Sequence, residues 1–272
     1  MTRQITGYLP LSILGGRDYS NNLWRTNLLI KSFDTFFTSP LTLLIVCPPD
    51  QLDVIRTGVV TTPKITLQFI DQEDILPGIT TSAAIGWYKQ QVLSFAVAVK
   101  YPTLTILKLD PDLILVNPVD HADFFMGDLT ANDMWHMQAN KLATSYIYCS
   151  SLLNRVIPDQ SLGLKWTPFI LDPTVVAALI SQLASQGMSL LDLATKHPWT
   201  ETLLYNIVAN SSFKIKNLHF QAPLIGSMLE SKTQIFNFRI IPGKGIFATL
   251  QGFTGITEDQ VSAILTKSGI TL

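Results

Sequence analysis

The chain has few charged residues and no cluster of basic ones. Charged residues make up only 14% of its 272 residues, well below the usual quarter. The formal net charge is −1, and no block of lysine and arginine occurs, so a nucleic-acid backbone is not an expected partner. Hydrophobic residues reach 47%, which predicts an ordered globular protein with a large core.

The chain also lacks a long uninterrupted apolar run. No stretch of about 18 uncharged apolar residues is present, so no membrane-spanning helix is predicted. The N-terminal residues Met-Thr-Arg-Gln-Ile-Thr-Gly do not have the layout of a signal peptide. A cytoplasmic protein is therefore expected, and its positive mean hydropathy favours peripheral contact with the inner face of a membrane or a homo-oligomer.

Cysteine is scarce, and two common catalytic motifs are missing. Cys47 and Cys149 have no metal-ligand spacing, so buried free thiols in a reducing compartment are expected, with a disulfide as the alternative. The absence of Gly-x-x-x-x-Gly-Lys-Ser/Thr argues against a P-loop NTPase. The absence of Gly-x-Ser-x-Gly argues against a serine hydrolase of the α/β type.

The apolar pattern of the first half predicts alternating strands and helices. Strands are expected at 5–14, 41–47, 65–70 and 104–109, and helices at 22–37, 51–56 and, after a cap at Thr81 or Ser82, up to residue 100. Such alternation is typical of βαβ crossovers and of a mainly parallel sheet flanked by helices. Ligands of these sheets bind beyond the carboxyl ends of the strands.

The second half is less regular. Strands are predicted at 167–171, 213–220 and 233–241, and helices at 175–183, 190–196, 200–209 and 258–266, the last capped by Thr257. No internal repeat, low-complexity linker or composition break divides the chain. A single α/β domain spanning residues 1–272 is expected.

Two carboxylates follow the fourth predicted strand directly. The apolar run 104–109 ends in Asp110-Pro111-Asp112, and a second apolar run, 113–116, comes next. Burying two unpaired carboxylates is costly, so these side chains are expected to meet water, a cation or a ligand. Pro111 stiffens the corner because it fixes its own φ and keeps the residue before it out of the helical region. Carboxylate oxygens suit a hard divalent ion that carries phosphates.

These residues carry a family resemblance. The segment Leu107-Lys108-Leu109-Asp110-Pro111-Asp112-Leu113 resembles the Asp-x-Asp segment of GT-A glycosyltransferases, although Pro111 and Lys108 depart from the usual pattern. Gly86-Trp87-Tyr88-Lys89-Gln90-Gln91 is similar to the Gly-Trp-x-x-Gln-Gln element of a bacterial sugar-transferase group. Trp199-Thr200-Glu201 resembles the acidic, aromatic helix start of that group, and His219-Phe220 is similar to the late His-Phe of galactosyltransferases and glycogenin-type enzymes.

The resemblance implies a GT-A (Rossmann-like) fold and a metal-dependent transfer of a hexose. The donor is a nucleoside-diphosphate sugar, with a UDP-sugar favoured, and the acceptor is a saccharide or a lipid-linked saccharide in polysaccharide assembly. By this resemblance, residues 1–118 are expected to form the nucleotide-binding half, and residues 119–272 are expected to form the acceptor-side half. The alternative is a catalytically degenerate nucleotide- or carbohydrate-binding protein of the same fold, and a phosphoryl-transfer enzyme or phosphatase is a third candidate.

The resemblance also assigns roles to individual residues. Mn²⁺ or Mg²⁺ is expected on Asp110, Asp112 and His219, and catalytic roles are expected for Glu201 and Lys89. Nucleotide-sugar contacts are assigned to five residues: Arg17, Asp18, Trp87, Gln90 and Gln91.

Each assignment has a structural alternative. The Asp-Pro-Asp sequence also suits an ordinary turn, and His219 also suits an ordinary strand position. Glu201 also suits the first turn of a helix, where the dipole favours an acid. Trp199, considered as a platform for a sugar ring, also suits the core, and Lys89 also suits a solvated helix face.

Overall fold

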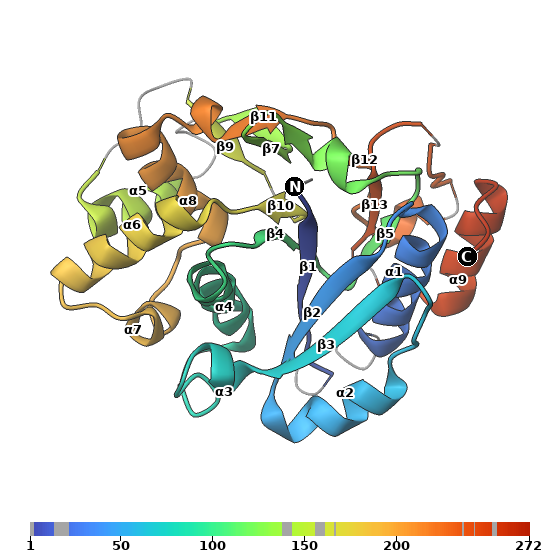
Figure 1. Ribbon diagram of the computed structural model, residues 1–272, viewed down its shortest axis with the longest axis horizontal. Helices are drawn as coiled ribbons and strands as arrows, with labels where there is room; N and C mark the ends of the chain where they lie inside the picture. The colour runs from blue at the N-terminus through green and yellow to red at the C-terminus, as the bar shows by residue number, and fades with distance from the viewer. Residues whose placement is uncertain are drawn as a thin grey trace. The chain divides into compact units, whose positions relative to one another are not determined.

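The computed structural model describes residues 3–13, 22–137, 143–155, 161–165, 167–235, 237–241, 243–251 and 255–272. The chain forms two compact units, and Figure 1 labels their helices and strands where there is room. The first unit contains Met1–Ile70, Leu109–Phe124 and Pro223–Leu272, and the second contains Asp71–Lys108 and Phe125–Ala222.

Strands and helices alternate at the start of the first unit. Its elements up to residue 71 are β1 (Ile5–Pro10), α1 (Asn22–Phe36), β2 (Leu41–Cys47), the 3₁₀ turn η2 (Pro49–Gln51), α2 (Leu52–Gly58) and β3 (Ile65–Asp71), whose last residue begins the second unit. The strands lie in the order β1-β2-β3, and β1 pairs parallel with β2. In β2, Leu-Thr-Leu-Leu-Ile-Val-Cys, every residue but Thr42 is buried, as expected for a strand covered on both faces.

The rest of the first unit forms a smaller sheet. Its elements are β5 (Leu113–Leu115), η3 (His121–Phe124), β12 (Ile225–Leu229), η7 (Lys232–Gln234), β13 (Phe247–Leu250) and α9 (Glu258–Lys267). The strand order is β12-β13-β5, with β12 parallel and β5 antiparallel to β13. The predicted cap of α9 is confirmed, because Thr257 and Gln260 bond reciprocally in a capping box.

The second unit is mainly helical, with short strands. Its helices are α3 (Gln72–Ile75), α4 (Gly86–Lys100), α5 (Ala143–Leu153), α6 (Pro173–Ser185), α7 (Leu190–Ala194) and α8 (Glu201–Val208), followed by the π-helical η5 (Ala209–Phe213) and the 3₁₀ turn η6 (Ile215–Asn217). Its strands are β4 (Thr105–Lys108), β6 (Phe125–Met126), β7 (Leu129–Asn132), β8 (Met134–His136), β9 (Leu162–Leu164), β10 (Phe169–Ile170) and β11 (His219–Gln221).

The strand pairs of this unit are short and mixed in direction. β4 pairs antiparallel with β10, β8 with β9, and β6 with β7, whereas β11 runs parallel to β7. Asn132 of β7 fastens β10, because its amide donates to Ile170 O at 3.0 Å and accepts from Ile170 N at 2.7 Å. Side chains therefore replace part of the backbone pairing that longer strands would supply.

Both cysteines are buried thiols outside any disulfide of the described residues, as the sequence predicts. Burial raises the pKa of the Cys149 thiol to about 12. Among the described residues, no helix is long and apolar enough to cross a bilayer.

Candidate active site

The acidic sequence Asp110-Pro111-Asp112 forms a tight turn in the first unit. Leu113 N donates to Asp110 O at 3.2 Å, which closes the turn, and Leu109 N donates to Tyr8 O at 2.8 Å just before it. At the far side, Leu250 N donates to Asp112 O at 2.8 Å. Since β1 and β13 hold both ends of the turn, the two carboxylates start from a fixed backbone.

The two aspartates have the right chemistry for a divalent cation. Both are partly exposed, and oxygen is the ligand type that Mg²⁺ and Mn²⁺ prefer. Within the described residues, no group of three or more His, Cys, Asp or Glu side chains is placed to hold a metal ion. Two carboxylates leave the other coordination positions of such a cation to phosphate oxygens and water, which are the ligands that Mg²⁺ usually takes with nucleotides.

His219 lies in a buried polar network of the second unit. Its Nδ1 is 2.7 Å from Thr130 Oγ1 and 2.9 Å from Asn132 Nδ2, and its Nε2 is 2.6 Å from the Tyr205 hydroxyl. The side chain is 1% exposed. Both ring nitrogens thus have partners within the second unit, and binding a metal would require His219 to give up one of these hydrogen bonds.

Burial makes His219 a source of pH-dependent stability. Desolvation lowers the pKa of His219 to about 4, although the charge of Asp172 opposes the shift. The pKa of His219 is lower in the folded protein than in the unfolded chain, where it is about 6.5. The free energy of unfolding is therefore highest above pH 6.5 and falls as the pH drops towards 4. We expect a loss of about 3 kcal/mol over that window, measured by urea unfolding at several pH values.

A matched variant isolates this effect. His136 is exposed, so His136→Gln is expected to keep the acid slope of the wild type, whereas His219→Gln is expected to flatten it. An unchanged slope in His219→Gln would assign the acid sensitivity to other groups.

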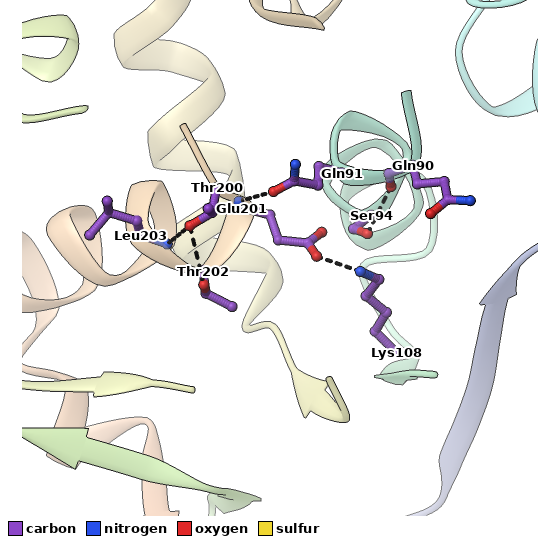
Figure 2. Close-up of polar contacts among 8 residues, drawn as sticks. All are labelled: Gln90, Gln91, Ser94, Lys108, Thr200, Glu201, Thr202 and Leu203. Carbon is purple, nitrogen blue, oxygen red and sulfur yellow. Dashed lines mark hydrogen bonds and ion pairs between the residues drawn. The ribbon is translucent and has the colours of Figure 1, made fainter. Parts of the chain in front are cut away.

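Glu201 forms a buried ion pair with Lys108 (Figure 2). Lys108 Nζ bonds to Glu201 Oε1, and both side chains are 7% exposed. The ammonium also lies 5.2 Å from the centroid of the Phe169 ring. Glu201 N donates to Gln91 Oε1 at 2.7 Å, so α4, β4 and α8 meet at this pair. Among the predicted site residues of the second unit, the structure brings together Glu201 and Gln91.

The other predicted residues of α4 point elsewhere. Lys89 Nζ donates to Thr80 O at 2.9 Å. The side chain of Gln90 is directed away from Gln91 (Figure 2), and the backbone carbonyl of Gln90 accepts from Ser94 Oγ at 3.1 Å. Trp87 is 49% exposed at the start of the helix. The motif Gly-Trp-x-x-Gln-Gln therefore presents its tryptophan to solvent and its second glutamine to the backbone N–H of Glu201.

Trp199 lies in the core, where the sequence left a sugar platform as one alternative. It is 1% exposed, and its Nε1 donates to Leu193 O and Lys196 O at 3.1 and 3.0 Å. A buried indole with a satisfied N–H has a packing role. Arg17 and Asp18, the predicted nucleotide contacts after β1, lie outside the described residues.

The sequence interpretation treated Lys108 only as a departure from a motif and missed its role. A lysine inside an otherwise apolar strand is a usable signal, because a buried ammonium requires a charged partner. The pattern does not identify that partner, since Glu201 is 93 residues away in the chain.

Comparison with known proteins adds a family and a fold. The profile of a family described as "Family of unknown function (DUF6492)" matches residues 2–266. No curated protein matches the sequence. Among solved structures, the apo form of mouse xyloside xylosyltransferase 1 is similar, with a TM-score of 0.54 and 13% identity over 93% of this chain and 99% of that one.

The structural match confirms the predicted fold class. The chain has the fold of that xylosyltransferase, an α/β fold with a mainly parallel sheet flanked by helices. At 13% identity, the match shows the fold and assigns no chemical role to an individual side chain.

Proposed function

The chain belongs to the family of unknown function DUF6492, and we propose that it is a metal-dependent glycosyltransferase. The donor is a nucleoside-diphosphate hexose, with UDP favoured, and the acceptor is a saccharide or a lipid-linked saccharide of a surface polysaccharide. The observation that carries the proposal is the Asp110–Asp112 turn in a chain that shares the fold of a xylosyltransferase over nearly its whole length.

The residue types fit this chemistry. Departure of a nucleoside diphosphate leaves negative charge on the phosphates, and a divalent cation supplies the charge that stabilises it. In this proposal Asp110 and Asp112 hold Mn²⁺ or Mg²⁺. The third predicted ligand, His219, would have to give up one of its hydrogen bonds to bind the ion.

The remaining assignments complete the proposal. Arg17 and Lys89 contact the phosphates, and Asp18 binds the base or the ribose. Gln90, Gln91 and Trp87 line the nucleotide-sugar site. Glu201 accepts hydrogen bonds from acceptor hydroxyls or acts as a base, and for either role it must share its carboxylate with Lys108.

A nucleotide-binding experiment tests the proposal. UDP, GDP, ADP and their hexose conjugates are titrated into the protein by calorimetry, each with Mn²⁺, with Mg²⁺ and with EDTA. We expect one nucleotide to bind only when a divalent cation is present, with a matching rise in melting temperature. Equal affinity with and without metal would contradict the mechanism.

The buried ion pair favours a second candidate, a binding protein that has lost catalysis. Glu201, the proposed base, is paired and almost inaccessible, which is unusual for a residue that must reach a substrate hydroxyl. Slow donor hydrolysis separates the two candidates. Release of hexose from the bound nucleotide sugar during a long incubation supports the enzyme, and binding without release supports the binding protein.

The proposed location follows from the proposed acceptor. A lipid-linked acceptor would bring the protein to the inner face of a membrane from the cytoplasm, as a peripheral protein. Sedimentation with vesicles that carry such an acceptor, compared with vesicles that lack it, measures that association.

A further inference from the structure

The second unit has another ion pair between a lysine and a buried acid, Lys165 and Asp133. Lys165 Nζ is 3.2 Å from Asp133 Oδ1, and the side chains are 35% and 8% exposed, respectively. In the pair of Lys108 and Glu201, by contrast, both side chains are 7% exposed. The Asp133 carboxylate is therefore nearly as buried as that of Glu201, but its lysine remains accessible from solvent.

Four strands meet at this pair. Asp133 joins β7 to β8, and Lys165 follows β9, where its N–H donates to Asp133 O at 3.0 Å. Gln221 ends β11, which runs parallel to β7 with Gln221 opposite Asn132. Its Nε2 donates to Asp133 Oδ1 at 3.3 Å, and its Oε1 accepts from Met134 N at 2.9 Å. Because both ends of the Gln221 amide are held, the amide orients the carboxylate.

The carboxylate of Asp133 uses one of its two oxygens. Lys165 and Gln221 both bind Oδ1, whereas no donor of the described residues reaches Oδ2, which is not sealed from solvent. An ammonium has three donors and no acceptor, and within the described part of the chain Lys165 Nζ is paired with Asp133 alone. An open acceptor therefore lies beside open donors.

The charges of this site select a neutral ligand. Asp133 and Lys165 cancel, and the Gln221 amide carries no charge. A phosphate would meet the carboxylate and a metal ion would meet the ammonium, so either would be repelled by a like charge. A hydroxyl both donates and accepts. One hydroxyl can therefore donate to Asp133 Oδ2 while its neighbour accepts from Lys165 Nζ, and adjacent hydroxyls are the defining groups of a saccharide.

We propose that Asp133, Lys165 and Gln221 form a binding site for adjacent hydroxyls of a neutral saccharide. Asp133 Oδ2 accepts from one hydroxyl, Lys165 Nζ donates to the oxygen of the next, and Gln221 holds the carboxylate in place. If the saccharide is the acceptor, a meaning that rests on the proposed function, Asp133 determines which acceptor is selected. The saccharide site itself does not depend on sugar transfer.

Saccharide titration tests the site in the full chain. Neutral disaccharides of glucose, galactose, mannose and xylose are titrated by calorimetry, without nucleotide and with UDP plus Mn²⁺. We expect one of them to bind the wild type and Asp133→Asn to weaken that binding about tenfold. Since Lys165 and Gln221 both donate to Oδ1, the amide oxygen of the variant takes that position, and an amide nitrogen, which cannot accept, replaces Oδ2.

Two further variants complete the series. Lys165→Gln removes the open donors at a side chain that is 35% exposed, and it should weaken the same saccharide by a similar factor. Asp128→Asn is the matched control, because Asp128 is an exposed aspartate between β6 and β7 of the same unit. It should bind like the wild type.

Deoxy analogues of the bound saccharide separate a direct contact from a structural effect. The wild type should bind about tenfold more weakly the analogue that lacks the hydroxyl bound by Asp133. Asp133→Asn should bind this analogue and the parent saccharide with equal affinity, because the partner of that hydroxyl has already been removed. A variant that is only less stable would still distinguish the two saccharides.

Three results would overturn the saccharide site. They are equal affinity of Asp133→Asn and the wild type, a preference for the parent over every deoxy analogue that persists in Asp133→Asn, and a panel from which no saccharide binds. Metal-dependent nucleotide binding by the wild type is measured separately. Its absence counts against the proposed function, while saccharide binding that depends on Asp133 would still stand.

Discussion

Asp110→Asn and Asp112→Asn are each expected to reduce metal-dependent nucleotide affinity by about a hundredfold and to abolish sugar transfer. An amide has nearly the shape of a carboxylate but carries no charge, so the backbone turn and its bond from Leu113 N to Asp110 O should persist. Calorimetry with nucleotide and Mn²⁺ measures the loss. Unfolding in urea checks that stability stays within about 0.5 kcal/mol of the wild type, the usual range for surface substitutions.

Asp50→Asn is the matched control for these variants. Asp50 is an exposed aspartate of the first unit, in the 3₁₀ turn η2, and its neutralisation changes the net charge by the same amount. It should leave nucleotide affinity unchanged. If all three variants lose affinity equally, the effect is one of overall charge, and the acidic turn is not a metal site.

Breaking the ion pair between Lys108 and Glu201 is expected to have the largest effect on stability. Lys108→Met alone leaves a buried carboxylate without its cation, and Glu201→Gln alone leaves a buried ammonium without its anion. Each should lower the free energy of unfolding by about 3–5 kcal/mol, measured by urea unfolding at pH 7. The double variant Lys108→Met/Glu201→Gln should recover most of the loss, because it buries neither charge.

The double variant also tests catalysis by Glu201. If the glutamate serves as the base, the stable double variant loses activity while it keeps nucleotide affinity. If the glutamate only holds α4, β4 and α8 together, the stable double variant keeps both. A double variant as unstable as the single ones would show that the network needs its charges, contrary to the expected recovery.

The sequence predicted regular elements best where local signals agree. The strand at 41–47 is confirmed over its full length. A short continuous run of branched apolar residues is typical of a buried strand. The last helix is confirmed with its cap, since Thr257 and Gln260 satisfy each other locally. The prediction of Pro173 in a first helical turn is confirmed as well, with Asp172 accepting from Thr174 N and Val175 N.

Prediction failed where tertiary contacts override the local pattern. The strand predicted at 213–220 is wrong: a π-helical turn and a 3₁₀ turn occupy most of it, and only His219–Gln221 is extended, where it pairs with β7. The strand predicted at 233–241 is also wrong, since a 3₁₀ turn, Lys232–Gln234, opens it and no strand is found in its described residues. Strands form instead at Ile225–Leu229 and Phe247–Leu250.

The helix start at Thr81 or Ser82 is wrong for a related reason. α4 begins at Gly86 after Ile85, which offers no side-chain cap. Glu73 binds the backbone of Gly78 and Thr80 and holds the preceding loop out of the helix. A capping preference depends only on one residue and its near neighbours. It therefore does not reveal that Glu73, eight residues before Thr81, binds the backbone of the loop.

For the candidate site, the sequence predicted the local features of single segments better than the contacts between distant residues. The Asp110–Asp112 turn and the Glu201 helix start are local features, and the structure has both. The pairings of Glu201 with Lys108 and of His219 with Tyr205 depend on how distant segments pack. A single sequence indicates that a buried charge or a buried polar ring needs a hydrogen-bonding partner, but it does not identify that partner.

The two buried thiols also determine how the protein can be labelled. Cys47 and Cys149 are 0% exposed, which shields both from maleimides and iodoacetamides. The Cys149 thiol, with a pKa of about 12, is also almost entirely protonated at neutral pH and therefore a poor nucleophile. A cysteine engineered at the exposed Thr81 would then be the favoured site of attachment in an otherwise native chain. A fluorophore placed there would lie in the loop before α4, and neither natural cysteine would have to be removed.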